Sequence, residues 1–210
     1  MNQKFKFISK LSFAFFLIFP FCSCKKTFLD VSPQGQITES SIANDPNIAR
    51  KLVTGVYNQL YQGGFGNDVH GIIFCMATDV ASDDADKGST ADDQAPQATG
   101  FDNFTSDLNS TNYYVDRLWN GHYQVISTAN QALDKLDKSL FDHVTKRTLI
   151  GEVKFLRAYI YFNLVRLFGG VPLILRVPTD LTDARLPEFQ TRASKDSVYA
   201  AIISDLQYGV

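Results

Sequence analysis

The sequence predicts a mainly helical protein, because its two longest apolar patterns have helical periodicity. From Val115 to Leu136, the apolar side chains fall within an arc of about 100° on a helical wheel, the width of one buried face. A turn at 137–139 follows, and residues 149–168 repeat apolar side chains in the same way. This second helix should end at Gly169-Gly170, where glycine permits a left-handed backbone. We therefore expect a pair of long helices, folded back on each other, at the core.

The second of these helices carries a further apolar stripe, made of Phe155, Tyr159 and Phe162. A helix that is apolar on two faces is expected to pack between neighbours. We predict that this helix is packed between neighbours rather than laid on a surface.

Two shorter helices flank the pair. One begins at Asp45-Pro46, an N-cap followed by an N1 proline, and ends at Gly63-Gly64. The other follows Ser194, with apolar residues at i+4 spacing. We expect a polar stretch at 38–44, a loop at 65–71, an extended run at 171–175 and a polar connector at 176–193. The last helix has no later partner in the sequence, so we expect an incomplete, N-terminal portion of a longer protein that is unstable or aggregates in isolation.

Residues 1–23 are predicted to be a lipoprotein signal peptide. Three lysines precede an apolar run from Leu11 to Phe21 that is too short to span a bilayer. Ser23 before Cys24 suits lipoprotein signal peptidase, which leaves acyl chains on the cysteine; an ordinary secretory peptide is the alternative. We assign residues 24–44 to a lipid-anchored tether and residues 45–210 to a helical domain.

The charge balance argues against a nucleic-acid partner. The formal net charge is −2 at pH 7, and removal of the leader takes away lysines but no acid. Cys75 lies alone in the apolar run 72–77, so we expect it to be a small buried hydrophobic residue.

Residues 78–112 form a long segment with little periodicity, and such segments are usually functional or disordered. Its aspartates include Asp83, Asp84 and Asp86, which are candidate calcium ligands. The residue order of an EF-hand is absent, so a solvated acidic loop is the default interpretation and calcium is the alternative. No other cofactor is expected.

Four aromatic residues lie at the end of this segment: Phe101, Phe104, Tyr113 and Tyr114. Exposed rings on a loop can stack on a sugar ring, whereas buried ones would pack onto the helices. Both interpretations stay open at this point.

The motifs of common enzymes are missing. No phosphate-binding loop, serine-hydrolase elbow or zinc-protease motif occurs. His122 and Trp119 lie on an apolar helix face and are expected to be core residues. Glu152, Arg157 and Arg166 are expected to form ion pairs along their helix. Nothing here predicts an enzyme.

Several motifs resemble, in the same order, the N-terminal part of SusD/RagB-family outer-membrane lipoproteins. They are Cys-Lys-Lys-Thr-Phe-Leu-Asp from Cys24 with Pro33, Leu-Val-Thr-Gly-Val-Tyr from Leu52, Leu-Trp-Asn-Gly-His-Tyr from Leu118 with Ala129-Asn130, Gly-Glu-Val-Lys-Phe-Leu-Arg-Ala-Tyr from Gly151, Phe-Gly-Gly-Val-Pro-Leu from Phe168, and Ser197-Val198-Tyr199 with Asp205-Leu206. The resemblance implies tetratricopeptide-like helix pairs and a location on the exterior of the outer membrane. It also implies a non-catalytic protein that captures glycans and delivers them to a SusC-like TonB-dependent transporter.

Two other functions are open. A surface lipoprotein with helix pairs can be a scaffold for protein or peptide partners. A surface glycoside hydrolase would need two placed carboxylates, and the acidic loop offers no rigid pair.

Overall fold

The computed structural model describes residues 38–61, 69–88, 90 and 96–208. The predicted signal peptide, Cys24 and most of the tether lie outside these residues. The described part is helical and contains no β-strand. Its elements are α2 (Glu39–Asn44), α3 (Pro46–Leu60), α4 (Ile72–Cys75), the π-helix η3 (Met76–Val80), α5 (Pro96–Asn103), α6 (Tyr113–Asp137), α7 (His143–Phe168), the 3-10 helix η4 (Asp183–Arg185), α8 (Pro187–Gln190) and α9 (Lys195–Tyr208).

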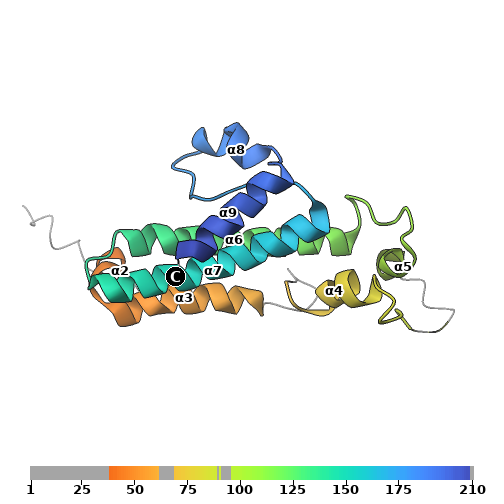
Figure 1. Ribbon diagram of the computed structural model, residues 1–210, viewed down its shortest axis with the longest axis horizontal. Helices are drawn as coiled ribbons and strands as arrows, with labels where there is room; N and C mark the ends of the chain where they lie inside the picture. The colour runs from red at the N-terminus through yellow and green to blue at the C-terminus, as the bar shows by residue number, and fades with distance from the viewer. Residues whose placement is uncertain (1–37, 62–68, 89, 91–95, 209–210) are drawn as a thin grey trace, which may run out of the picture. The chain divides into compact units, whose positions relative to one another are not determined.

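The helix pair α6–α7 forms the core, as the periodicity predicts (Figure 1). Asn112 caps α6 by accepting hydrogen bonds from the backbone N–H groups of Tyr114 and Val115. Asp142 caps α7 through Thr145 N–H, and the helix ends at Gly169, whose φ is 73°. Most of the main apolar stripe of each helix is buried in one cluster.

Helix α3 packs on both long helices and starts at the predicted Asp45-Pro46. The expected polar stretch at 38–44 is instead helix α2. Thr38 and Ser41 form a capping box at its start, and Ile42 is buried. One apolar residue among polar neighbours gave no periodic pattern, which is why the prediction missed this helix.

The segment from residue 72 to residue 103 contains more helix than expected. Helix α4 continues into the π-helix η3, and α5 lies within the stretch predicted to lack structure. Ile73, Phe101 and Leu118 form a second, smaller core cluster here. Cys75 is exposed, so the prediction that it is buried is wrong. Helix α4 turns Ile73 inward, and two residues later the helical rotation of about 200° points Cys75 outward.

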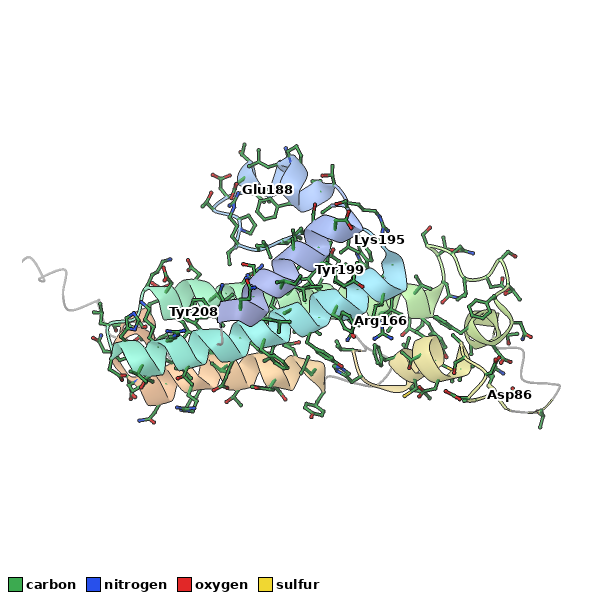
Figure 2. The ribbon with its side chains drawn as sticks, in the orientation of Figure 1. Asp86, Arg166, Glu188, Lys195, Tyr199 and Tyr208 are labelled. Carbon is green, nitrogen blue, oxygen red and sulfur yellow. The ribbon has the colours of Figure 1, made fainter. Side chains whose placement is uncertain are left out.

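Helix α9 packs against α7 and begins after Ser194, whose hydroxyl accepts a hydrogen bond from Ser197 N–H at 3.1 Å. Between the two helices, residues 171–175, the predicted extended run, belong to no helix or strand. The chain then makes the short helices η4 and α8, where the prediction had only a polar connector (Figure 2).

The second apolar stripe of α7 is only partly covered by the described residues. Phe155 is 55% exposed and Phe162 is 39% exposed, while Tyr159 is half-buried against His70. Helix α7 does pack between neighbours, since it contacts α6, α3 and α9, but within the described part these neighbours leave Phe155 and Phe162 exposed. On α9, Tyr199, Ile203 and Leu206 are also exposed.

Candidate functional site

Of the four predicted ligand-stacking residues, Phe101 is buried, Tyr114 is partly buried, and Phe104 and Tyr113 are exposed. Phe101 is buried in the small cluster with Ile73, and Tyr114 packs against the same cluster. Phe104 is 70% exposed and Tyr113 is 37% exposed. The structure brings Phe101 and Tyr114 together as packing residues, which leaves Phe104 and Tyr113 as the rings that a ligand could reach.

The accessible rings stand at the two ends of a polar loop, residues 105–112, that joins α5 to α6. Phe104 has a positive φ of 50°, so its ring leaves the helix in a direction that an ordinary helical residue would not take. The Arg117 guanidinium lies 4.7 Å from the centre of the Tyr113 ring. Exposed rings beside amide, hydroxyl and guanidinium groups suit a ligand with flat apolar faces and many hydroxyl groups. We refer to Phe104 and Tyr113 as the aromatic pair.

The acidic residues Asp83, Asp84 and Asp86 are exposed on the loop after η3. Figure 2 labels Asp86. Asp86 accepts a hydrogen bond from Gly88 N–H at 3.1 Å, which stabilises a turn. Within the described part of the chain, no three His, Cys, Asp or Glu side chains come together as a metal site. Asp92 and Asp93 lie outside it. The calcium interpretation stays a prediction.

His122 and Trp119 pack as the sequence predicts. His122 is fully buried, and its Nδ1–H donates to the Leu118 carbonyl at 2.7 Å. Trp119 is partly buried and packs edge-on against Phe168, with ring centres 5.1 Å apart. Arg192 stacks on the same indole. Neither residue is available as a ligand platform.

A buried ionic cluster around Arg157 is the main feature that sequence reasoning missed. Its guanidinium donates to both carboxylate oxygens of Asp205 at 2.7 and 2.8 Å, and it is only 5% exposed. It also donates to Asn130 Oδ1 at 2.7 Å and to the Leu175 carbonyl at 2.8 Å. Lys154 lies 3.3 Å from Asp205. The expected pairing of Arg157 along its own helix is therefore wrong, because the side chain points into the core.

The same cluster fixes the extended run 171–175. The Tyr123 hydroxyl donates to the Pro172 carbonyl at 2.8 Å, and Asn130 donates to the Ile174 carbonyl at 2.9 Å. The Tyr161 hydroxyl donates to Ile174 O and accepts from Ile174 N–H. Burial raises the pKa of Tyr123 and the pKa of Tyr161 well above their usual range, so both stay neutral donors. Side chains thus replace the hydrogen bonds that a neighbouring strand would provide.

A second arginine cluster links residues within the connector 176–193 to one another. Arg176 makes two hydrogen bonds to Asp183, at 2.5 and 2.6 Å, and a further one to Glu188. Its guanidinium also lies 4.7 Å from the centre of the Phe189 ring. Hydrogen bonds from Arg176 hold the pKa of Asp183 well below its usual range.

Comparison with known proteins identifies the class. Residues 27–210 match the family model of SusD-like proteins, described as starch-binding and associating with the outer membrane. The chain therefore belongs to the SusD-like family. A SusD-like protein of Formosa agariphila is 26% identical over 92% of this chain, and one of Bacteroides ovatus is 23% identical over 90%.

Solved structures show the same helical fold. A laminarin-binding SusD-like protein superposes with a TM-score of 0.59 at 30% identity over 78% of this chain. The surface glycan-binding protein A from Bacteroides fluxus superposes with a TM-score of 0.62 at 21% identity over 78% of this chain. The predicted mainly helical, SusD-like fold is confirmed.

The chain spans about a third of the length of the relatives named above. It covers 36% and 32% of the two related sequences, and 33% and 32% of the chains in the two solved structures. Among the described residues, no helix combines the length and the apolar character that a membrane span requires.

Proposed function

We propose that this protein captures glycans at the cell surface without catalysing a reaction. The observation that carries the proposal is the match of residues 27–210 to a family described as starch-binding and associating with the outer membrane. The likeness to a laminarin-binding protein supports a polysaccharide or oligosaccharide as the ligand.

Within the described part of the chain, the aromatic pair is our candidate for contact with sugar. An aromatic ring stacked on a sugar contributes apolar burial without requiring charge. The loop between the rings provides polar groups, and Asn109 and Asp107 already order it through local hydrogen bonds. A pre-ordered loop loses less conformational entropy on binding.

Attachment to the membrane and delivery to a transporter complete the proposal. Acyl chains on Cys24 would anchor the protein in the outer membrane, facing the exterior, since two or more chains hold a protein stably. A SusC-like TonB-dependent transporter would receive the glycan. The family description supports the membrane association.

The binding proposal is tested with the full chain and a panel of soluble glycans that includes laminarin oligosaccharides. We expect one glycan to bind, and Phe104→Ala with Tyr113→Ala to weaken it about tenfold, because two stacked rings at about 0.5–1.5 kcal/mol each are removed. Tyr61→Ala is the matched control, since Tyr61 is an exposed ring at the end of α3. Equal weakening by Tyr61→Ala, or no binding in the panel, would contradict the proposal.

A second candidate function, a scaffold for protein partners, is favoured by the exposed apolar side chains on α7 and α9. Phe155, Phe162 and Ile203 are large and accessible. Purification of the tagged protein from gently solubilised outer membranes separates the two. A large β-barrel transporter in the eluate supports glycan uptake, and other partners without glycan binding support the scaffold.

A further inference from the structure

A small cavity of about 240 Å³ lies between α4–η3 and the C-terminal part of α7. Its lining residues are Phe74, Ala77, Thr78, Asn163, Arg166 and Leu167. It lies outside the aromatic pair and the two arginine clusters. Because sites for drug-sized ligands start at about 300 Å³, a cavity of this size suits one sugar unit or one substituent of a glycan.

One lining residue of the cavity carries a buried hydrogen-bond donor that has no acceptor among the described residues. Asn163 is only 3% exposed, and its Nδ2 finds no acceptor among the described residues. A buried amide donor left unpaired costs about 1–3 kcal/mol. Such a group in a native helix calls for an explanation, and a ligand oxygen in the adjoining cavity would provide one.

Arg166 provides a second hydrogen-bond donor at the edge of the cavity. Arg166 comes from the turn after Asn163 on α7 and is exposed, with its guanidinium 5.0 Å from the centre of the Phe162 ring (Figure 2). Its stacking on Phe162 orients the side chain while leaving the N–H groups at its edge available. The described lining residues contribute no carboxylate. Two donors, one of them cationic, therefore meet at a cavity whose own lining has no carboxylate; the Asp79 carboxylate lies beside the lining, 3.2 Å from the Thr78 hydroxyl.

The remaining walls are apolar or already hydrogen-bonded. Phe74 provides an aromatic wall, and the Thr78 hydroxyl donates to the Phe74 carbonyl at 2.9 Å. Ala77 and Thr78 belong to the π-helix η3, an element that is rare and often occurs at functional sites. The hydrogen-bonding capacity that the cavity offers is thus concentrated in Asn163 and Arg166.

We propose that this cavity binds an oxyanion, a carboxylate or a sulfate group, carried by a sugar. Arg166 supplies the charge and a planar set of N–H donors that fits such a group. Asn163 supplies the neutral donor, and Phe74 contacts the apolar face of the ring. The sugar part of this inference rests on the proposed glycan capture and names an acidic glycan as the ligand class; the oxyanion part rests on the cavity alone.

The probes are D-glucuronate, D-glucose and inorganic sulfate, titrated into the ¹⁵N-labelled full chain. The readout is the side-chain amide resonance of Asn163, assigned by its absence in Asn163→Asp. We expect glucuronate to shift this resonance and to bind at least tenfold more tightly than glucose. A glucose affinity equal to that of glucuronate would overturn the proposal. Sulfate as tight as glucuronate would assign the site to a free anion and overturn the sugar part.

Three variants test the two donors. Asn163→Asp keeps the shape but places a negative group at the buried end, so we expect glucuronate binding, followed by calorimetry, to be lost. Arg166→Gln is on the surface, and we expect it to lower glucuronate affinity about tenfold and to remove the preference over glucose. Arg147→Gln, an exposed arginine elsewhere on α7, is the matched control and should change affinity less than twofold. Unchanged binding in Arg166→Gln would contradict the proposal.

The test of the oxyanion site can fail or succeed independently of the test of glycan capture. Phe104→Ala and Tyr113→Ala should leave glucuronate binding unchanged while weakening the panel glycan. If a neutral glycan binds and glucuronate does not, the oxyanion inference fails and glycan capture stands.

Discussion

Arg157 and Arg176 make almost the same contact in two different surroundings. Each guanidinium holds one aspartate through two hydrogen bonds of 2.5–2.8 Å. The side chain of Arg157 is 6% exposed, whereas that of Arg176 is 46% exposed. We expect the two contacts to differ in energy, because burial and the elements joined decide what such a contact contributes.

The two clusters also join different lengths of chain. Arg157 on α7 holds Asp205 of α9, Asn130 of α6 and the Leu175 carbonyl, so it links elements that are distant in sequence. Arg176 holds residues at most 12 positions away. The motif residues Asn130, Arg157 and Asp205 therefore meet at one place in the core, which gives them a structural role.

The largest effect is expected for Arg157→Met. Among the described residues, the substitution leaves the buried Asp205 carboxylate with Lys154 as its remaining cation, and it removes the donor for Leu175 O. Breaking one side of a buried ion pair costs about 3–5 kcal/mol. Urea denaturation of the variant should show a loss in the free energy of unfolding of this size.

The double variant Arg157→Met with Asp205→Leu is the control. Because it removes both charges, it should recover part of the lost stability. If the single and double variants are equally destabilised, packing rather than the unpaired charge is the cause.

Gly170→Ala tests the junction between the two regions and should have the next largest effect. A Cβ at Gly170 would lie 2.3 Å from the Ala193 carbonyl oxygen, where the connector returns to hydrogen-bond Val171. The backbone would have to shift, at a cost of about 2–3 kcal/mol by thermal or urea unfolding. Gly55→Ala in α3 meets no atom within 4 Å and should instead stabilise by about 0.5–1 kcal/mol. Equal effects of the two substitutions would contradict this explanation.

Tyr161→Phe tests how much the Tyr161 hydroxyl stabilises the extended run 171–175. The hydroxyl both donates to Ile174 O and accepts from Ile174 N–H, so its loss leaves the N–H without this acceptor. We expect a destabilisation of about 1–2 kcal/mol. Amide exchange at Ile174 should accelerate more than exchange in α3, and unchanged exchange at Ile174 would rule out this role.

The long helices could be predicted because their signals are local and repeated. Caps at Asp45, Ser194 and the glycine at 169 marked helix ends correctly. Helices α2 and α5 were missed because each buries too few apolar residues to give a periodic pattern. Cys75 was misplaced because an unbroken apolar run does not reveal which side faces solvent.

The sequence pattern could have predicted that Arg157 is buried, but not that Asp205 is its partner. Arg157 is four residues after Val153 and three before Ile160, on the buried stripe of α7. Asp205 is 48 positions away, so periodicity could not pair them. For the same reason, the cavity beside Asn163 and the division of the four aromatic residues into buried and exposed rings could come only from the fold.

The smallest effect is expected for Arg176→Gln, which breaks the exposed cluster. The change should leave the midpoint of global unfolding nearly unaltered, because the cluster is solvated and joins residues that are close in sequence. Its effect should be local: amide exchange and protease cleavage should become faster between residues 177 and 186.

Acid should cause the same faster amide exchange in the unmodified protein. The folded pKa of Asp183 is depressed below its ordinary 3.8, so the stabilisation is complete above that pH and is lost as the pH falls toward the depressed pKa. Loop exchange corrected for its intrinsic pH dependence should therefore be constant from pH 7 to pH 5 and rise below about pH 4. A loss of protection already at pH 5 would show that Asp183 does not hold the loop.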